Sequence, residues 1–412
     1  MKKILHILAQ VPGATGSGTF LQALIREGAK KGYAQGLVAG VPHDYINDLI
    51  LENCNVDFYA VEFETPELPF PVVGMSDTMP YPSTRYMDMT DGMLAQWKAA
   101  FAKKVLEASR QFRPDYIICH HLWLLTALVA EQIRDIPIIA ICHGTDLRQL
   151  EKVGRFAEEA VCGCSKVNLV FALSDHQKER IAQHYEFEEN QIIVVGGGFR
   201  QDIFYPGIGE RKPGPIRIVY AGKLSFSKGV DSLIRAFDLM DGDDCELYLV
   251  GSGAGEEADK IRELGKLSQK KKVFTGAVPQ ERLGEIFRES DLFVLPSFYE
   301  GLSLVLIEAL ASGLRVVSSE LPGLKEWLGK DICQSGAIEF AALPQLIDVD
   351  KPVRSELPAF EDRIKQAIVL QKQRILKDTP LDQALIQSRI MLLSWEGIFQ
   401  KIENCLENLR YS

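Results

Sequence analysis

Residues 290–313 read SDLFVLPSFYEGLSLVLIEALASG, and the elements they contain recur along the whole chain. The apolar run at residues 292–295 ends at Pro296, which is typical of a buried strand, and a helical pattern begins near Leu302. The same alternation of a short apolar run with a helical pattern extends in both directions. It predicts a parallel sheet with helices on both faces.

The alternation places twelve strands in the two halves of the chain. They are expected at residues 4–8, 36–39, 56–61, 116–120, 138–142, 169–173, 192–195, 216–221, 247–250, 273–275, 292–295 and 316–318. Helices are expected between most of them, for example at residues 19–31, 92–111 and 230–240, and a last helical stretch covers residues 381–409.

A Gly- and Pro-rich segment at residues 196–215, GGGFRQDIFYPGIGERKPGP, lies near the midpoint of the chain. Such a composition is typical of a linker. The sequence therefore predicts an α/β protein of two doubly wound, Rossmann-like domains joined by a hinge. The first domain covers residues 1–200, with a C-terminal helix at about 394–412 packing back on it, and the second covers residues 212–393.

The composition excludes several classes of protein. The chain has 412 residues, of which 46% are hydrophobic and 25% charged, as in ordinary globular proteins. The formal net charge of −10 argues against a nucleic-acid partner recognised through overall charge. The longest near-apolar run, residues 122–130, is too short to span a bilayer. The eight cysteines are scattered without zinc or redox spacing, so we expect a cytoplasmic, metal-free protein.

Residues 62–91 form a proline-rich stretch with no helical or strand pattern. Ordered loops of this length are uncommon and usually functional. Arg85 lies there among small hydroxyl residues, a suitable setting for a carboxylate or phosphate. The alternative is that Arg85 pairs with Asp77 or Asp88 and only orders the loop.

Two glutamates in residues 290–313 are the first candidates for chemistry, because open parallel sheets bind ligands at the carboxyl ends of their strands. Glu300 lies just ahead of the helix and Glu308 more than two turns into it, a rise of roughly 12 Å. Between them, the free N–H groups of Gly301, Leu302 and Ser303 would form an anion site. Glu308 stands among leucines, where an unpaired carboxylate costs several kcal/mol, so it needs a partner or ligand. The alternative is a paired glutamate on a surface helix.

Two lysines follow the strand expected at residues 216–221. Lys223 comes after it with only Gly222 between, and Lys228 precedes the next helix. Cations beside a helix N-terminus would stabilise the charge of a departing diphosphate. The alternative is a solvated loop.

Together these motifs resemble the retaining glycosyltransferases of the family 4 type, which have the GT-B fold of two domains facing across a cleft. Glu300 and Glu308 match the paired glutamates of that family. The resemblance implies that Glu300 lies against the donor sugar and Glu308 binds the nucleotide ribose. Lys223 and Lys228 match the basic pair that holds the donor pyrophosphate, although the family usually has Arg at the first position. The loop FTGAV at residues 274–278 matches one that lines the base pocket, which implicates Gly276 and Val278.

The N-terminal half matches the family more loosely. Residues 12–18, PGATGSG, resemble the Gly-rich loop near the donor phosphates, which implicates Gly16. The segment ICHGTD, residues 141–146, matches one that faces the donor sugar and acceptor, so His143 is expected at the reaction and Asp146 at the acceptor. His120 matches the second His of a strand-end His-x-His, in which Ile118 replaces the first, whereas His121 is expected to be structural.

The resemblance implies a retaining, metal-independent glycosyltransferase with no cofactor. Its donor would be a nucleotide sugar, with a UDP-sugar expected, and its acceptor a small, anionic molecule. The departing phosphate would help to deprotonate the acceptor on the front face of the sugar. Three alternatives stay open: another GT-B enzyme such as an epimerase or phosphorylase, a transferase acting on a lipid at a membrane surface, and a non-catalytic sugar-nucleotide binder. The basic helix at residues 92–111 is the argument for the membrane.

Two rival enzyme classes lack their motifs. The glycine pairs Gly16/Gly18 and Gly251/Gly253 are not followed by the third glycine of a dinucleotide-binding loop. The Asp-x-Asp pairs at residues 241–243 and 348–350 do not follow strands, as a metal-dependent transferase would require.

The sequence departs from the family pattern beyond Ile332. Residues 335–339 read SGAIE where the family usually has an apolar strand.

Overall fold

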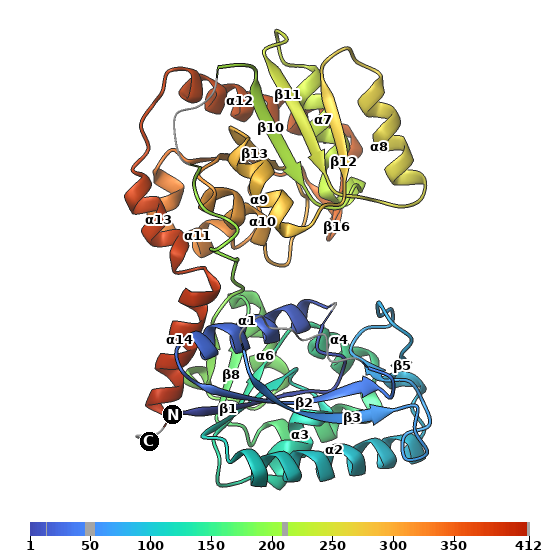
Figure 1. Cartoon of the computed structure of the whole chain (residues 1–412). Helices are drawn as coiled ribbons and strands as arrows, with labels where there is room; N and C mark the ends of the chain where they lie inside the picture. The colour runs from blue at the N-terminus through green and yellow to red at the C-terminus, as the bar shows by residue number, and fades with distance from the viewer. Residues whose placement is uncertain (14, 46–53, 208–212, 410–412) are drawn as a thin grey trace. The chain divides into compact units, whose positions relative to one another are not determined.

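The computed structural model describes residues 1–13, 15–45, 54–207 and 213–409, which form two compact units (Figure 1). Unit 1 comprises Met1–Gly197 and Ile398–Ser412, and unit 2 comprises Gly198–Gly397. The last segment of the chain therefore belongs with the first unit. Residues 208–212 of the predicted hinge lie outside the described residues.

Unit 1 is built on a seven-stranded sheet in the order β3-β2-β1-β6-β7-β8-β9, in which all pairs are parallel. The strands are β1 (Lys3–Leu8), β2 (Ala34–Pro42), β3 (Val56–Phe63), β6 (Tyr116–His120), β7 (Ile138–Ile141), β8 (Leu169–Ala172) and β9 (Ile192–Val194). The helices are α1 (Gly16–Lys30), α2 (Asp91–Phe112), α3 (Leu124–Gln132), α4 (Thr145–Lys152), α5 (Ala157–Cys164), α6 (Asp175–His184) and α14 (Trp395–Asn408).

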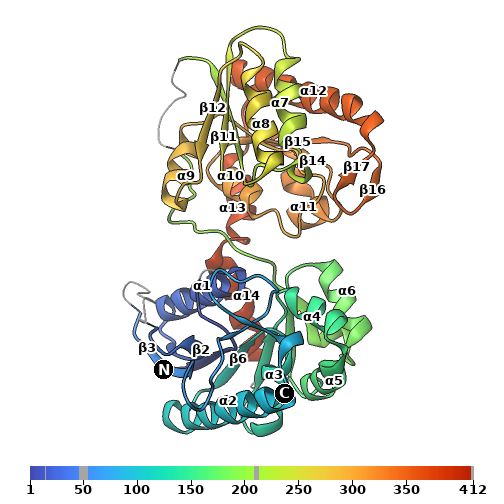
Figure 2. The ribbon, with the colours of Figure 1, turned by 90° about the vertical axis from the view of Figure 1, so that its right-hand side faces the viewer.

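Alternate side chains of these buried strands point to opposite faces of the sheet, so each face has its own helical cover. Leu5 and Ile7 of β1 join the core beneath α2 and α3, whereas Leu8 packs with residues of α1 on the other face (Figure 2). Helix α14 lies beside α1, where the ring of Phe399 meets that of Tyr33 edge-on at 5.7 Å. The first and last helices thus cover the same part of unit 1.

Unit 2 repeats this plan with a six-stranded parallel sheet in the order β12-β11-β10-β13-β14-β15. Its strands are β10 (Ile216–Ala221), β11 (Cys245–Val250), β12 (Lys272–Gly276), β13 (Leu292–Leu295), β14 (Arg315–Ser319) and β15 (Ile338–Ala341), and a short hairpin is formed by β16 (Leu346–Asp348) and β17 (Lys351–Pro352). Its helices are α7 (Val230–Asp238), α8 (Glu256–Lys266), α9 (Gln280–Arg288), α10 (Leu304–Ala311), α11 (Leu324–Gln334), α12 (Leu357–Leu376) and α13 (Gln383–Met391).

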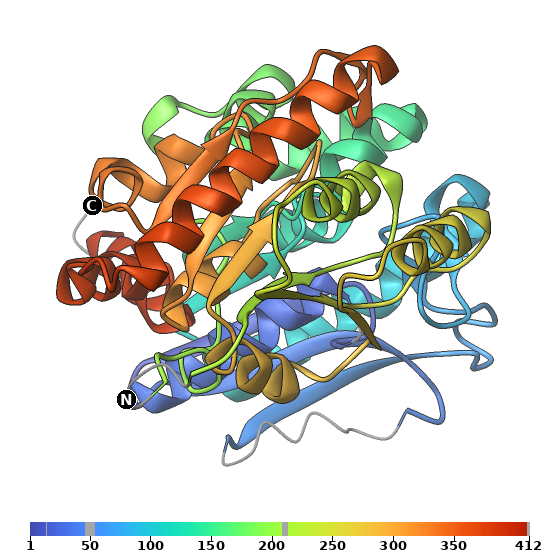
Figure 3. The ribbon, with the colours of Figure 1, turned by 90° about the horizontal axis from the view of Figure 1, so that it is seen from above.

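The helices of unit 2 form two layers around this sheet. The core on one face includes residues of α7, α8 and α12, and the core on the other includes residues of α9, α10, α11 and α13. Figure 3 shows the long α12 lying across β14 and β15. Several candidate site residues, among them His120 and Glu300, end or follow strands of these sheets.

The doubly wound α/β fold predicted from the sequence is confirmed, but three local expectations were wrong. Residues 335–339, which depart from the usual apolar strand, lead into β15, which pairs with β14. Residues 62–91 are not patternless: β4 (Val73–Gly74) pairs with β5 (Thr84–Arg85), and a 3-10 turn follows at Tyr86–Asp88. The last helical stretch is two helices, α13 and α14.

Residues 62–91 contribute to the core of unit 1 through single side chains rather than a periodic face. Phe63, Val72 and Tyr86 are buried, and the Tyr86 ring packs edge-on against Trp97 and Trp123. This packing accounts for the order of the stretch, because each buried aromatic side chain removes a large apolar area from water. The length of the loop alone thus gives no sign of a ligand.

Candidate functional site

A cavity of about 330 Å³ lies in unit 2 at the carboxyl ends of its strands. It is lined by Tyr220, Ala221, Gly222, Lys228, Val250, Gly251, Ala277, Val278, Leu283, Leu295, Glu300, Val305 and Glu308. Strands β10, β11 and β13 end at Ala221, Val250 and Leu295, so the cavity sits where an open parallel sheet binds ligands. A mixed apolar lining with a few polar groups is typical of small-molecule sites.

Glu308 is the most unusual group in this cavity. It is the fifth residue of α10, just over one turn into the helix rather than the predicted two, because α10 begins at Leu304. The residue is 7% exposed, and no described residue donates a hydrogen bond to its carboxylate. Burial raises the pKa of the Glu308 carboxyl from its ordinary value of 4.5 to about 7. A buried carboxyl without a protein donor is suited to hydrogen bonds from a ligand.

Glu300 and Lys228 form an ion pair at the same cavity, with 2.7 Å between Lys228 Nζ and Glu300 Oε2. The hydroxyl of Ser297 donates to the other carboxylate oxygen, Oε1, at 2.6 Å. Gly229 makes the pairing possible: its φ is +63°, and a Cβ there would lie 2.1 Å from the carbonyl oxygen of Pro296. The residue after Lys228 thus touches the backbone just ahead of Glu300.

Other predicted donor-site residues lie around this pair. Val278 lines the cavity, whereas Gly276 ends β12 next to it and accepts a hydrogen bond from the backbone of Gly251 at 2.9 Å. Lys223 is exposed and does not line the cavity; its carbonyl accepts the Tyr220 hydroxyl at 2.8 Å. The expected pair of lysines is therefore reduced to Lys228 at the cavity wall.

Gly301, Leu302 and Ser303 connect Glu300 to the first turn of α10. Gly301 is exposed, Leu302 half-buried and Ser303 buried. Their backbone N–H groups donate to no described residue. Unpaired donors at a helix N-terminus are suited to an anion, as the sequence predicted.

Three residues of this site were not among the predicted donor-site residues, although Gly251 lies in the loop VGSG, residues 250–253, which resembles a loop of the family. Tyr220 and Gly251 line the cavity, and Ser297 holds Glu300. Burial and the nearby Glu300 raise the pKa of the Tyr220 hydroxyl well above its usual value, so it stays protonated. Gly251 has a φ of +135°, and a Cβ there would lie 1.9 Å from the Gly222 carbonyl oxygen. Gly251 and Ser297 follow β11 and β13, and Tyr220 is the last residue but one of β10, so a position near a strand end is a signal that could have found them.

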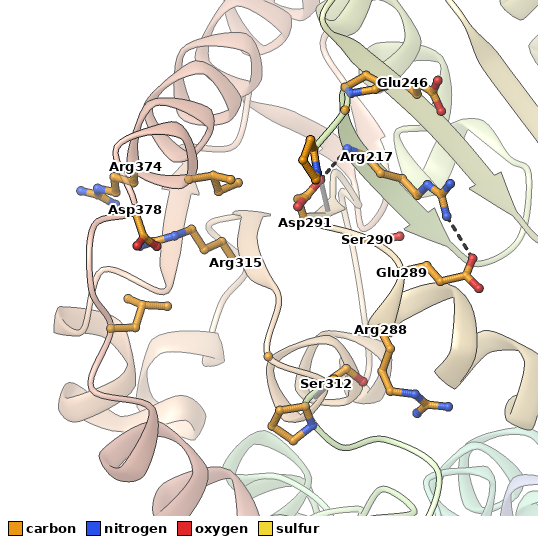
Figure 4. A pocket seen from close by; sticks show the side chains of 18 of the residues that line it. Arg217, Glu246, Arg288, Glu289, Ser290, Asp291, Ser312, Arg315, Arg374 and Asp378 are labelled. Carbon is orange, nitrogen blue, oxygen red and sulfur yellow. Dashed lines mark hydrogen bonds and ion pairs between the residues drawn. The ribbon is translucent and has the colours of Figure 1, made fainter. Parts of the chain in front are cut away.

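A second, larger cavity of about 1070 Å³ lies at the opposite, amino-terminal ends of the same strands. Several charged groups in this cavity are paired with one another. The Arg217 guanidinium forms an ion pair with Glu289 at 3.0 Å, and the Arg217 backbone N–H donates to Asp291 at 2.8 Å (Figure 4). Figure 4 also shows Arg315 reaching towards Asp378 rather than into the open space. Among the described residues that line this cavity, we find no buried group without a partner comparable to Glu308.

In unit 1, three histidines follow or end neighbouring strands. His120 ends β6 and lies in contact with His143, which follows β7: their rings stack at 5.6 Å with an interplanar angle of 12°. His121 lies 4.9 Å from the His143 ring and is 4% exposed, in keeping with the structural position expected for it. Phe20 of α1 meets His143 edge-on at 5.3 Å. His143 is partly exposed, so it is the member of the group that a ligand can reach.

Asp146 does not lie where an acceptor could contact it. The residue is fully buried, and its Oδ2 accepts hydrogen bonds from the backbone N–H groups of Leu122 at 2.9 Å and His143 at 3.1 Å. It therefore ties the loop after β6 to the loop after β7. The acceptor contact predicted from the motif is at odds with this placement.

Arg85 and Gly16 complete the predicted residues of unit 1. The Arg85 guanidinium donates through Nε and Nη2 to both oxygens of Asp88, at 2.6 and 3.1 Å, which is the alternative in which Arg85 orders the loop. Gly16 is the first residue of α1, and the preceding Thr15 caps the helix by accepting from the Gly18 N–H at 3.1 Å. Neither residue contacts the histidines in the described structure.

Within the described ranges, no three His, Cys, Asp or Glu side chains are grouped so as to hold a metal ion. In the same part of the chain, no helix has the length and apolar composition that crossing a bilayer requires.

Comparison with known families gives one match in each half of the chain. Residues 15–202 match the model of the family described as "Glycosyltransferase Family 4". Residues 215–342 match that of "Glycosyl transferases group 1". The first match ends five residues after the division between the two units at Gly197 and Gly198, and the second lies within unit 2.

Curated relatives are distant. The chain is 29% identical over 257 residues to D-inositol 3-phosphate glycosyltransferase of Corynebacterium aurimucosum, a match that covers 55% of this chain and 61% of the relative. It is 25% identical over 258 residues to glycogen synthase of Mycobacterium tuberculosis, covering 56% of this chain and 58% of the relative. The chain thus spans about six tenths of the length of the curated relatives it matches.

Solved structures share the fold over nearly the whole chain. A glycosyltransferase from Rickettsia africae superimposes with a TM-score of 0.67 at 13% identity, covering 99% of this chain and 98% of that one. Anabaena HepE in complex with UDP superimposes with a TM-score of 0.63 at 17% identity, covering 99% of this chain and 100% of that one. At these identities the likeness establishes the fold alone.

Proposed function

The chain belongs to the glycosyltransferases of the family 4 type and has the GT-B fold, and from this premise we propose that it transfers a sugar from a nucleotide-sugar donor to an acceptor hydroxyl. The transfer proceeds with retention of configuration and without a metal ion. Unit 2 binds the donor, and unit 1 supplies the groups that meet the acceptor.

The observation that carries this proposal is the Glu308 carboxylate. It is buried, has no donor among the described residues, and lines a cavity of about 330 Å³. A ribose presents two adjacent hydroxyls, and both can donate to one carboxylate. Such hydrogen bonds to a charged acceptor are worth about 1.5–3 kcal/mol each, which offsets the burial of the charge.

The remaining groups of the cavity suit the rest of a nucleotide sugar. Lys228 offers a cation, and the N–H groups of Gly301, Leu302 and Ser303 offer unpaired donors, so both favour a diphosphate. Glu300 is held by Lys228 and Ser297 and accepts hydroxyl hydrogens of the sugar. Glu300 is given no role as a covalent nucleophile in this proposal, and the departing phosphate takes the acceptor proton.

The names of the relatives support a choice of first substrates. Anabaena HepE is described in complex with UDP and with UDP-glucose, so a UDP-sugar is the proposed donor. Several relatives are named D-inositol 3-phosphate glycosyltransferase, and their acceptor is a small anionic polyol. We extend that acceptor class, a small anionic molecule with free hydroxyls, to this chain.

The experiment is a screen of nucleotide sugars for thermal stabilisation of the full chain, followed by product analysis with and without acceptors. A ligand at 100 times its dissociation constant adds about 2.7 kcal/mol of stability, which is readily measured. Transfer predicts nucleotide release that depends on an acceptor. Conversion of the sugar without an acceptor would assign an epimerase, and binding with no turnover would assign a sugar-nucleotide binder; either result overturns the proposal.

A further inference from the structure

Four side chains form one hydrogen-bonded line across the sheet of unit 1. Gln35 on β2 lies 3.0 Å from His6 on β1, measured from Oε1 to Nε2. His6 Nδ1 lies 3.4 Å from Nε2 of His120 on β6, and His120 Nδ1 lies 3.4 Å from Nε2 of His143 after β7. The line crosses the neighbouring strands β2, β1 and β6 and ends beyond β7. It therefore connects the buried interior to the strand ends.

Helix α1 covers this line from end to end. Its Gly28 lies so close to Gln35 that a Cβ would be 2.4 Å from the amide nitrogen, and its Phe20 packs against His143. His6 is fully buried and His120 is 2% exposed. No water or other partner can replace a hydrogen bond in the middle of the line without opening this packing.

The direction of every hydrogen bond follows from Gln35. Its amide nitrogen faces the Tyr33 carbonyl at 3.4 Å, which leaves the amide oxygen towards His6. An oxygen without hydrogen only accepts, so His6 Nε2 carries a hydrogen. A neutral imidazole has one N–H, so His6 Nδ1 is bare and His120 Nε2 must donate to it. With its one hydrogen on Nε2, His120 has a bare Nδ1, so His143 Nε2 must donate to it.

This order of hydrogen bonds needs neutral imidazoles, and the surroundings of the histidines favour the neutral form. Burial lowers the pKa values of His6 and His120, and the pKa of His143 is lowered by burial and by His121 beside it. Asp146 is a carboxylate against this group; it lies 3.9 Å from His121 Nδ1 and accepts two backbone N–H bonds. His143 Nδ1 is bonded by no described residue.

We propose that Gln35 is a positioning residue that acts through His6 and His120 to hold His143 in its Nε2–H tautomer. His143 then presents a bare Nδ1 at the carboxyl end of the sheet as a hydrogen-bond acceptor for a substrate hydroxyl. The last step rests on the proposed transferase function, whereas the tautomer itself does not.

The test is ring-¹⁵N NMR of the full chain labelled at histidine, at pH 7.5, because nitrogen shifts distinguish the two tautomers and the cation. We expect His6, His120 and His143 to be Nε2–H in the wild type. Gln35→Leu removes the acceptor of the His6 Nε2–H group. We then expect all three histidines to change to the Nδ1–H tautomer, because an Nε2–H of His6 would be left buried against the leucine without an acceptor. Gln149→Leu removes another buried glutamine of unit 1, one that donates to the Met75 carbonyl, and leaves the tautomers unchanged.

A wild-type His143 that is Nδ1–H or cationic would overturn the proposal without reference to any variant, even if Gln35→Leu fails to fold. Tautomers that are unchanged in a folded Gln35→Leu protein would overturn it as well. In transfer assays, Gln35→Leu is expected to lower kcat about tenfold with unchanged donor affinity. A change of all three histidines to the Nδ1–H tautomer with unchanged kcat would contradict the proposed contact between His143 Nδ1 and a substrate hydroxyl. The expected tautomers in a protein with no transferase activity would count against the proposed function alone.

Discussion

Lys228 Nζ lies 2.7 Å from Glu300 Oε2, so the cation that faces the donor cavity is held by the carboxylate at the same cavity. The two residues are 72 positions apart in the chain and belong to loops after β10 and β13, which are neighbouring strands. Their pairing fixes both side chains before a ligand arrives. It also predicts which lysine matters for the diphosphate.

Replacing Lys228 by alanine should weaken UDP binding by about 10- to 100-fold, the loss expected for one or two hydrogen bonds to a charged group. Lys223→Ala is the matched control, because Lys223 is exposed and does not line the cavity. Calorimetric titration with UDP measures both variants. Equal losses of UDP affinity in the two variants would show that both lysines bind the diphosphate, as the motif implied, and would contradict the assignment to Lys228 alone.

Glu308 should make the stability of the protein depend on pH. Its pKa is raised to about 7 in the folded state from an ordinary value of 4.5, so the folded protein binds the proton more tightly than the unfolded chain does. Its stabilising contribution is complete below pH 4.5 and is lost as the pH rises through 7. The stability of Glu308→Gln relative to the wild type should therefore increase between pH 5 and pH 8, by up to roughly 3 kcal/mol.

Urea denaturation at the two pH values tests this dependence. Glu263→Gln is the control, because Glu263 lies exposed on α8 of the same unit. A pH-independent difference between wild type and Glu308→Gln would show that the carboxyl of Glu308 has an ordinary pKa.

Arg85→Ala should leave the preference between an anionic and a neutral acceptor unchanged, because the guanidinium is already engaged by Asp88. An exposed pair of this kind contributes little to stability, so the melting temperature should change little as well. Competition assays with inositol 3-phosphate and inositol measure the preference. A selective loss of activity on the phosphorylated acceptor would return Arg85 to the acceptor site.

Transfer should continue in excess EDTA, because Lys228 and the N–H groups of residues 301–303 supply the positive charge that a metal ion would otherwise provide. Initial rates before and after chelation, and after adding Mg²⁺ or Mn²⁺, are the measurement. Loss of activity with EDTA and recovery with either ion would contradict metal-independent transfer.

Much of the fold was predictable because buried parallel strands give short apolar runs, and β6, β10 and β13 fall at the predicted residues. The strand β15 was missed because its residues Ile338–Ala341 include Glu339, which pairs with Arg374 of α12. A charge compensated by a distant helix cannot be recognised from the local pattern. The aromatic packing within residues 62–91 is equally invisible, since it has no period.

The residues of the candidate site were likewise predictable only in part. Glu300 and Glu308 were found because they lie in one recognisable segment, residues 290–313, and Lys228 because it follows a predicted strand and precedes a helix. His6 and Gln35 were not found, because they become neighbours of His120 only through the order β2-β1-β6 in the sheet. The burial of Asp146 was also unforeseen, because its two backbone donors come from separate loops.

The most direct test of the account is the affinity for UDP-glucose of the wild type, Glu308→Gln and Glu263→Gln at pH 6 and pH 8. UDP-glucose is a phosphate diester and lacks the second phosphate pKa near 6, so its own charge stays constant. If ribose hydroxyls donate to the Glu308 carboxylate, wild-type binding tightens about tenfold from pH 6 to pH 8, as the carboxyl loses its proton. Glu308→Gln should bind more weakly at pH 8 and show no pH dependence, while Glu263→Gln follows the wild type. Binding by Glu308→Gln with wild-type affinity and pH dependence would contradict the assignment of this cavity to the donor nucleotide.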